Sequence, residues 1–131
     1  MRGVAVLSNS ALIFIGAGIG GVLRYWVAHG VYFILGRQFP YGTFVVNVSG
    51  CFLMGLLYVI TLERLDGAGA QLRALLLIGL LGGYTTFSSF SIETINLFES
   101  GNWLGALMNV LLSTIICIVA AWLGIMGGRS L

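Results

Sequence analysis

Four long runs of apolar residues, separated by short polar links, make up most of this chain. They cover about residues 11–35, 42–62, 72–98 and 103–126. A helix needs about 20 mainly apolar residues to cross the hydrocarbon core of a bilayer, so each run is long enough to span one. The pattern therefore predicts an all-α membrane protein with four transmembrane helices, which form a single transmembrane domain over residues 1–131.

The third run is interrupted by small and polar residues, which read Gly82-Gly83-Tyr84-Thr85-Thr86-Phe87-Ser88-Ser89-Phe90. Lipid offers no hydrogen-bond partner to a free backbone group, so a helix at membrane depth is normally continuous. Irregular backbone is tolerated where it is buried in protein or lines a wet cavity, and such breaks often form ion sites. We therefore predict that the third helix breaks near its middle and that this break carries the function.

The composition agrees with a membrane protein, because 59% of the residues are hydrophobic and only 8% are charged. A soluble domain carries roughly 25% charged residues. The six basic residues are all arginines, too few for a nucleic-acid-binding surface. The sequence contains no catalytic triad spacing, metal-ligand cluster or nucleotide loop in a soluble context, so we do not expect an enzyme.

The arginines predict an orientation. With four spans, both termini and the second link lie on one side of the membrane. Cytoplasmic links carry an excess of arginine and lysine, so the distribution favours cytoplasmic termini. Four arginines fall on the side of the termini and one on the other, namely Arg2, Arg64, Arg73 and Arg129 against Arg37.

Two charged residues inside apolar runs are candidate functional residues, because ionisable groups are costly in lipid. Arg24 lies in the first run and is either a structural partner or an attractor of anions at a pore mouth. Glu93 lies one helical turn after Phe90 and is a site candidate, with structural pairing as the alternative. His29 is interpreted as an interfacial histidine rather than a metal ligand, because no second histidine supports a metal site.

Small residues in the first run predict close helix packing. Gly16 and Gly20, and likewise Ala17 and Gly21, are four residues apart, a spacing that lets another helix approach closely. The two cysteines fall inside apolar runs, so we interpret them as small core residues rather than as a disulfide: Cys51 and Cys117.

Uncharged polar residues also occur at membrane depth. Asn47, in the second run, is either a link between helices or a hydrogen-bond donor in a permeation path. In the fourth run Asn109, Ser113 and Cys117 recur every four residues, with Thr114 beside them. A serine bonded to its own helix is the alternative, but the repeat over two turns favours a stripe that faces a wet space.

The two phenylalanines in the break suggest chemistry for an anion. The edge of a phenyl ring is electropositive, so Phe87 and Phe90 can direct ring edges at a small anion, although core packing is the alternative. Such a site carries no fixed positive charge, which lets the ion leave again. Carbonyl groups freed by the break can hold a hard monovalent cation. Further donors are available nearby from Asn47, Ser88, Ser89 and Ser113.

The segment from Gly82 to Glu93 closely resembles the signature of the Fluc (CrcB-type) fluoride channels. Gly42-Thr43-Phe44-Val45-Val46-Asn47 resembles the second-helix motif of that family, and Gly20-Gly21-Val22-Leu23-Arg24 resembles its first. The resemblance covers almost the whole chain, with matching length and four-helix plan.

The resemblance implies a passive, fluoride-selective channel of the bacterial inner membrane that lowers cytoplasmic fluoride. It implies an antiparallel, dual-topology homodimer with two pores, or pairing with an oppositely oriented paralogue, since the arginine count is unequal. A structural sodium ion at the dimer interface would be held by the backbone carbonyls of Gly82 and Thr85. Cys117 stands where the family would place a hydroxyl. The residues implied in the fluoride path are Asn47, Phe87, Phe90, Ser88, Ser89, Ser113 and Thr114.

Two functions from other classes remain open from the sequence alone. A small four-helix proton-coupled drug exporter would need a carboxylate in its first helix, and the first run contains none. A membrane subunit without transport activity would use its glycines and serines only for helix packing. Flux measurements separate both from a channel.

Overall fold

The computed structural model describes residues 2–65 and 69–131, and these residues are almost entirely helical. Within this part of the chain, four helical stretches are long and apolar enough to cross a membrane. The prediction of an all-α protein with four membrane-length helices is confirmed. In chain order, the elements are α1 (Arg2–Leu35), α2 (Tyr41–Val59), η1 (Ile60–Arg64), α3 (Gly69–Leu72), η2 (Arg73–Leu81), α4 (Gly82–Tyr84), α5 (Phe87–Glu99) and α6 (Trp103–Ser130), where η marks the wider π-helical turns.

The helices extend beyond the apolar runs that predicted them. α1 begins at Arg2 rather than near residue 11, and α6 ends at Ser130 rather than near residue 126. The link expected over residues 63–71 is helical at both ends, and its middle, 66–68, lies outside the described residues. Hydropathy marks the part of a helix that suits lipid, whereas backbone hydrogen bonding continues into polar turns.

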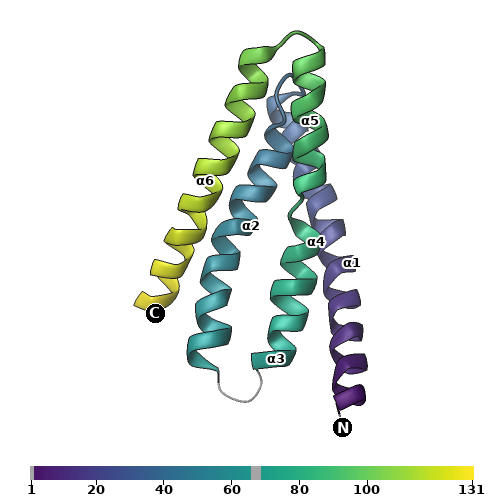
Figure 1. Ribbon diagram of the computed structural model, residues 1–131, viewed down its shortest axis with the longest axis vertical. Coiled ribbons are helices and arrows are strands. Elements are labelled where there is room, and N and C mark those ends of the chain that lie inside the picture. Colours follow the sequence, from purple (N-terminus) through teal and green to yellow (C-terminus); the bar gives the residue numbers. More distant parts are fainter. Residues whose placement is uncertain (1, 66–68) are drawn as a thin grey trace.

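The third span changes its packing partner halfway along its length. Its first half, η2 and α4, packs against α1, whereas its second half, α5, packs against α6. The fourth span also lies along α2, in the most extensive helix contact of the fold (Figure 1). The interruption between α4 and α5 therefore joins two helix pairs, α1 with the first half and α6 with the second.

The predicted close approach at the small residues of α1 is confirmed for Gly16 and Gly20. A Cβ atom on Gly16 would overlap the backbone carbonyl of Leu75, and one on Gly20 would overlap that of Leu80. Any larger residue would push η2 away from α1. Gly21 faces open space instead, so the second small-residue pair does not form a continuous contact surface.

Large apolar side chains cover the outside of the molecule, as expected for a surface in lipid or against a partner. Phe14 and Phe33, for example, are largely exposed, while Val46, Val59 and Leu81 are buried between the helices. The start of α1, the end of α6 and the η1 turns lie towards the same end of the bundle (Figure 1).

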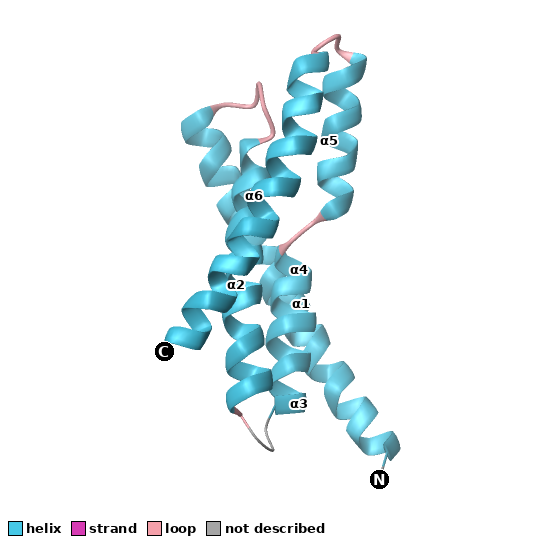
Figure 2. Ribbon diagram, turned by 60° about the vertical axis from the view of Figure 1, so that its left-hand side comes forward, coloured by secondary structure: helices cyan, strands magenta, loops and turns pink. Residues whose placement is uncertain are grey.

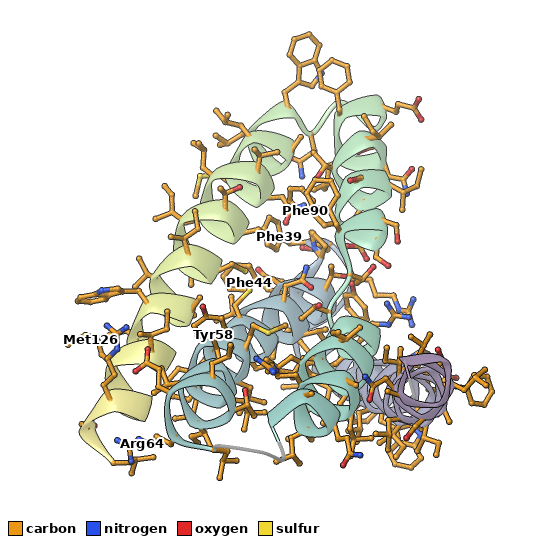
Figure 3. All side chains as sticks on the ribbon, turned by 60° about the horizontal axis from the view of Figure 1, so that its bottom comes forward. Phe39, Phe44, Tyr58, Arg64, Phe90 and Met126 are labelled. Carbon is orange, nitrogen blue, oxygen red and sulfur yellow. The ribbon has the colours of Figure 1, made fainter. Side chains whose placement is uncertain are left out.

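An ion pair ties the second and fourth spans together at that end. Arg129 Nη2 lies 3.0 Å from Glu63 Oε1, and Arg64 Nη2 donates to the Arg129 carbonyl at 3.3 Å. Figure 3 shows Arg64 beside the C-terminal end of α6. Which membrane face this end occupies stays a prediction from the arginine count.

Candidate functional site

The third span leaves the helical conformation for two residues. α4 ends at Tyr84, and Thr85 (φ −81°, ψ 158°) and Thr86 (φ −151°, ψ 121°) are extended before α5 begins at Phe87. Figure 2 shows this short non-helical segment between α4 and α5. The hydroxyl of Thr86 caps α5 by accepting the backbone N–H of Ser89 at 3.2 Å. The predicted break near the middle of the third helix is confirmed.

Asn47 on α2 satisfies the backbone of the break. Its Nδ2 donates to the Thr86 carbonyl at 2.9 Å, and its Oδ1 accepts the Thr86 N–H at 2.8 Å. In a continuous helix that N–H would bond to the Gly82 carbonyl, so the break exchanges an intrahelical bond for a bond to Asn47. An amide nitrogen carries two hydrogens, so one remains for the cavity that Asn47 also lines.

A cavity of about 320 Å³, here called the phenylalanine cavity, lies between the break, α2, α5 and α6. It brings together five of the seven residues that the sequence assigned to the ion path. No charged side chain lines it among the described residues. Its lining consists of Asn47, Cys51, Thr85, Thr86, Phe87, Phe90, Ser113, Thr114, Cys117 and Ile118.

The two phenylalanine rings form a pair at one side of this cavity. Their centroids are 5.3 Å apart with an interplanar angle of 42°. Phe90 points from α5 into the space beside α6 (Figure 3). Phe87 is 79% exposed in the single chain. An exposure this large argues against core packing within the chain as the role of Phe87.

The polar stripe on α6 divides into two parts. Asn109 is buried and donates to Thr94 Oγ1 on α5 at 2.8 Å, while Ser113 Oγ donates to Asn109 Oδ1 at 3.2 Å. Asn109 therefore ties α5 to α6. Ser113, Thr114 and Cys117 line the phenylalanine cavity. The hydroxyl of Ser113 bonds to a side chain rather than to its own helix backbone, so the alternative of simple back-bonding does not apply.

A second cavity of about 330 Å³, here called the Arg24 cavity, lies on the other side of the break. It is lined by two arginines, Arg24 and Arg37, and by the carboxylate of Glu93. The ion pair found among the described residues joins Arg129 to Glu63, so Arg24 is not neutralised by a salt bridge there. The remaining lining residues are Gly21, Tyr25, Ala28, His29, Tyr32, Thr43, Val46, Thr86 and Ser89.

Glu93 is held by hydroxyl groups from two other helices. Its Oε1 accepts from Thr43 Oγ1 at 2.8 Å and from the Tyr32 hydroxyl at 3.1 Å. Its Oε2 is buried and has no hydrogen-bond partner within residues 2–65 and 69–131. A buried unpaired oxygen costs free energy, so its position calls for a functional explanation. A further cavity of about 370 Å³ continues outward from Tyr32, Arg37 and Glu93.

Thr86 lines both the phenylalanine cavity and the Arg24 cavity.

The two predicted serines lie apart from the phenylalanines. Ser89 lines the Arg24 cavity, and Ser88 is absent from the described lining of both, with its Oγ 3.2 Å from Thr86 Oγ1. Thr86 was missed as a site residue, although its place in the Thr-Thr pair of the break was a usable signal.

The proposed cation ligands fit an oxygen-binding site. Gly82 is exposed, and its carbonyl has lost the Thr86 N–H to Asn47. Thr85 has an extended backbone, and its own hydroxyl is engaged with the Leu81 carbonyl at 2.9 Å. Hard cations bind oxygen ligands, including backbone carbonyls. The described residues contain no cluster of three or more His, Cys, Asp or Glu side chains.

Comparison with known proteins gives consistent matches over nearly the whole chain. A family model described as CrcB-like protein, Camphor Resistance (CrcB), matches residues 11–125. A fluoride-specific ion channel FluC of Coxiella burnetii (strain Dugway 5J108-111) is 58% identical over 123 residues, covering 94% of this chain and 99% of the relative. Proteins of the same name from Methylococcus capsulatus and Magnetococcus marinus are 50% and 49% identical over 119 residues each. Both alignments cover 91% of this chain, with 52% of the first relative and 96% of the second.

Proposed function

This chain belongs to the CrcB-like family, and we propose that it is a passive fluoride channel. The relatives described above are named as ion channels, and none of them is named as an enzyme. The observation that carries the proposal is the phenylalanine cavity. A broken membrane helix, two phenyl rings, one amide and four hydroxyl residues surround a space that no charged side chain lines among the described residues. Such donors replace part of the hydration shell of a small anion and still let it leave.

The Arg24 cavity supplies the entrance to this path. Arg24 and Arg37 give it positive charge, which raises the local concentration of anions. Thr86 and Ser89 offer hydroxyl groups at the boundary with the phenylalanine cavity. The ion thus passes from the Arg24 cavity, where charge attracts it, to the phenylalanine cavity, where uncharged donors bind it. Binding at several weak sites favours rapid transit over capture.

Two copies in opposite orientation complete the channel in this proposal. Phe87 is 79% exposed in the single chain, and the partner would cover it. Two symmetry-related pores then follow, and the fluoride gradient sets the direction, which is outward when cytoplasmic fluoride is high. Lipid contacts the apolar outer surface of this multi-pass protein in a bacterial inner membrane. A homodimer is the preferred assembly, and a pair with an oppositely oriented paralogue is the alternative.

The carbonyls of Gly82 and Thr85 would hold a structural sodium ion where the two copies meet. The ion would supply positive charge that offsets converging carbonyl dipoles at the interface. Asn47 supports these ligands indirectly, because it takes the N–H that a continuous helix would direct at Gly82.

Reconstitution of the purified protein into liposomes tests the function. We expect rapid fluoride efflux when a potassium ionophore balances charge, without a proton gradient, and far slower chloride efflux. A requirement for a proton gradient would indicate a coupled exporter. Absence of fluoride flux from folded, correctly inserted protein would refute the channel and leave a membrane subunit without transport activity.

A further inference from the structure

Two thiols from different helices face the phenylalanine cavity. Cys51 on α2 and Cys117 on α6 are the two cysteines of the chain, and both are free and half-buried. Both line the cavity, one from each of two helices that pack closely against each other. This pairing corrects the interpretation of both as plain core residues, because they border an open space.

The packing of α2 on α6 explains why the two thiols share one cavity. A Cβ atom on Gly55 would overlap the backbone carbonyl of Ala121, which shows that the two helix backbones are almost in contact there. The helices run in the same direction (Figure 1). Cys51 and Cys117 precede Gly55 and Ala121 by four residues each, so they form the equivalent pair one helical turn earlier.

We propose that Cys51 and Cys117 form a two-thiol site for a soft monovalent metal cation of the Cu⁺ or Ag⁺ type. Soft sulfur ligands select such ions over the hard cations that oxygen ligands prefer. Two sulfurs on facing helices suit linear coordination, whereas structural zinc needs four ligands. The described residues offer no third His, Cys, Asp or Glu in a cluster with them.

The charge balance of binding suits the interior of the membrane. One thiol loses its proton to water in the cavity and binds the cation as thiolate, while the second binds through its sulfur as a thiol. The resulting S⁻–M⁺–SH unit is neutral, which avoids the cost of burying an isolated charge. Metal affinity therefore rises with pH, because each bound ion releases a proton.

Occupation of the site has a consequence for transport that rests on the proposed function. The thiols share their cavity with Phe87, Phe90 and Ser113. A bound metal ion would occupy space on the fluoride path and obstruct flux. Binding itself does not depend on whether fluoride is the transported ion.

The binding test uses Ag⁺ and detergent-purified, reduced full-length protein in chloride-free buffer. Native mass spectrometry should find one tightly bound silver ion per chain. Cys51→Ser and Cys117→Ser should each weaken binding by more than about a hundredfold, since loss of a ligand exceeds the usual cost of losing an outer contact. The double variant gives the background from other sulfur and nitrogen atoms.

A second measurement needs no variant. Bound silver should protect both thiols of the wild-type protein from alkylation by N-ethylmaleimide to the same extent. Equal silver affinity in wild type and single variants, two independent silver ions per chain, or protection of one thiol alone would overturn the two-thiol site.

Fluoride efflux from liposomes then tests the consequence. Silver should block wild-type flux, a thiol chelator should restore it, and each single variant should keep its own silver-free rate. If the protein binds silver but shows no fluoride flux, the two-thiol site is supported and the proposed channel function is refuted. Normal flux that silver binding leaves unchanged would refute obstruction while preserving the channel.

Discussion

The cavities on the two sides of the helix break differ in their chemistry. The Arg24 cavity contains two arginines and a carboxylate, whereas the phenylalanine cavity is lined by phenyl rings, hydroxyls, thiols and one amide. Thr86 belongs to both. In the proposed function this difference is a division of labour, in which charge gathers the anion from water and weak, uncharged donors pass it onward.

The largest effect is expected at Asn47, which holds the boundary between the cavities. Asn47→Leu would keep the approximate volume but remove both hydrogen bonds to Thr86. Two backbone groups would lose their partners, which should lower the free energy of unfolding by about 2–6 kcal/mol and abolish flux. Denaturation in detergent measures the first quantity and liposome efflux the second.

Asn109→Leu is a useful comparison for that variant. It also removes a buried amide that bonds across helices, but it lies outside the lining of both cavities among the described residues. Similar loss of stability with retained flux would set Asn47 apart as a residue of the boundary. Wild-type flux through a stable Asn47→Leu protein would contradict a role for the boundary between the cavities in transport.

A smaller effect is expected when the uncharged side is altered. Phe87→Ile removes a phenyl ring and should lower fluoride flux about two- to tenfold, while the proposed dimer stays assembled. Phe98→Ile is the matched control, because Phe98 is on the same helix but stacks on Trp103 away from the cavity. Equal rates for wild type and Phe87→Ile would exclude Phe87 from the path.

Altering the charged side should have a more modest effect that depends on salt. Arg24→Gln should reduce flux about two- to fivefold at low ionic strength, because one attracting charge is lost. The deficit should shrink at high concentrations of an impermeant salt, which screens charge. Arg129→Gln, which alters an arginine outside both cavities, should leave flux unchanged. A deficit equal to that of Arg24→Gln would show that net charge matters rather than position.

The smallest effect is expected at Thr85. Its hydroxyl bonds to the Leu81 carbonyl, so the proposed sodium ligand is the backbone oxygen. Thr85→Val keeps the branched shape and should retain bound sodium. Electron density at the site, or the dependence of the proposed dimer's stability on sodium, measures this. Loss of the ion in this variant would indicate that the Thr85 hydroxyl, rather than its backbone carbonyl, binds sodium.

The sequence predicted the elements that lipid imposes on every membrane protein. Four apolar runs and one Gly/Thr/Ser interruption yielded the four spans and the broken helix. It also grouped Phe87 with Phe90, because residues three apart share a helix face. The same geometry places Ser88 and Ser89 on another side of α5, where Ser89 lines the Arg24 cavity rather than the phenylalanine cavity.

Contacts between distant segments could not be predicted from local pattern. Asn47 bonds to a residue 39 positions away. Glu93 accepts hydrogen bonds from hydroxyls on α1 and α2, and the two thiols share one cavity because α2 packs on α6. These contacts depend on the relative register of helices, which hydropathy does not encode.

The most direct test of the division of labour is the salt dependence of fluoride efflux in Phe87→Ile and Arg24→Gln, measured side by side in liposomes. The account predicts that added impermeant salt reduces the deficit of Arg24→Gln relative to wild type, while the deficit of Phe87→Ile stays constant. Deficits that respond equally to salt would contradict it, because both cavities would then act on the ion in the same way.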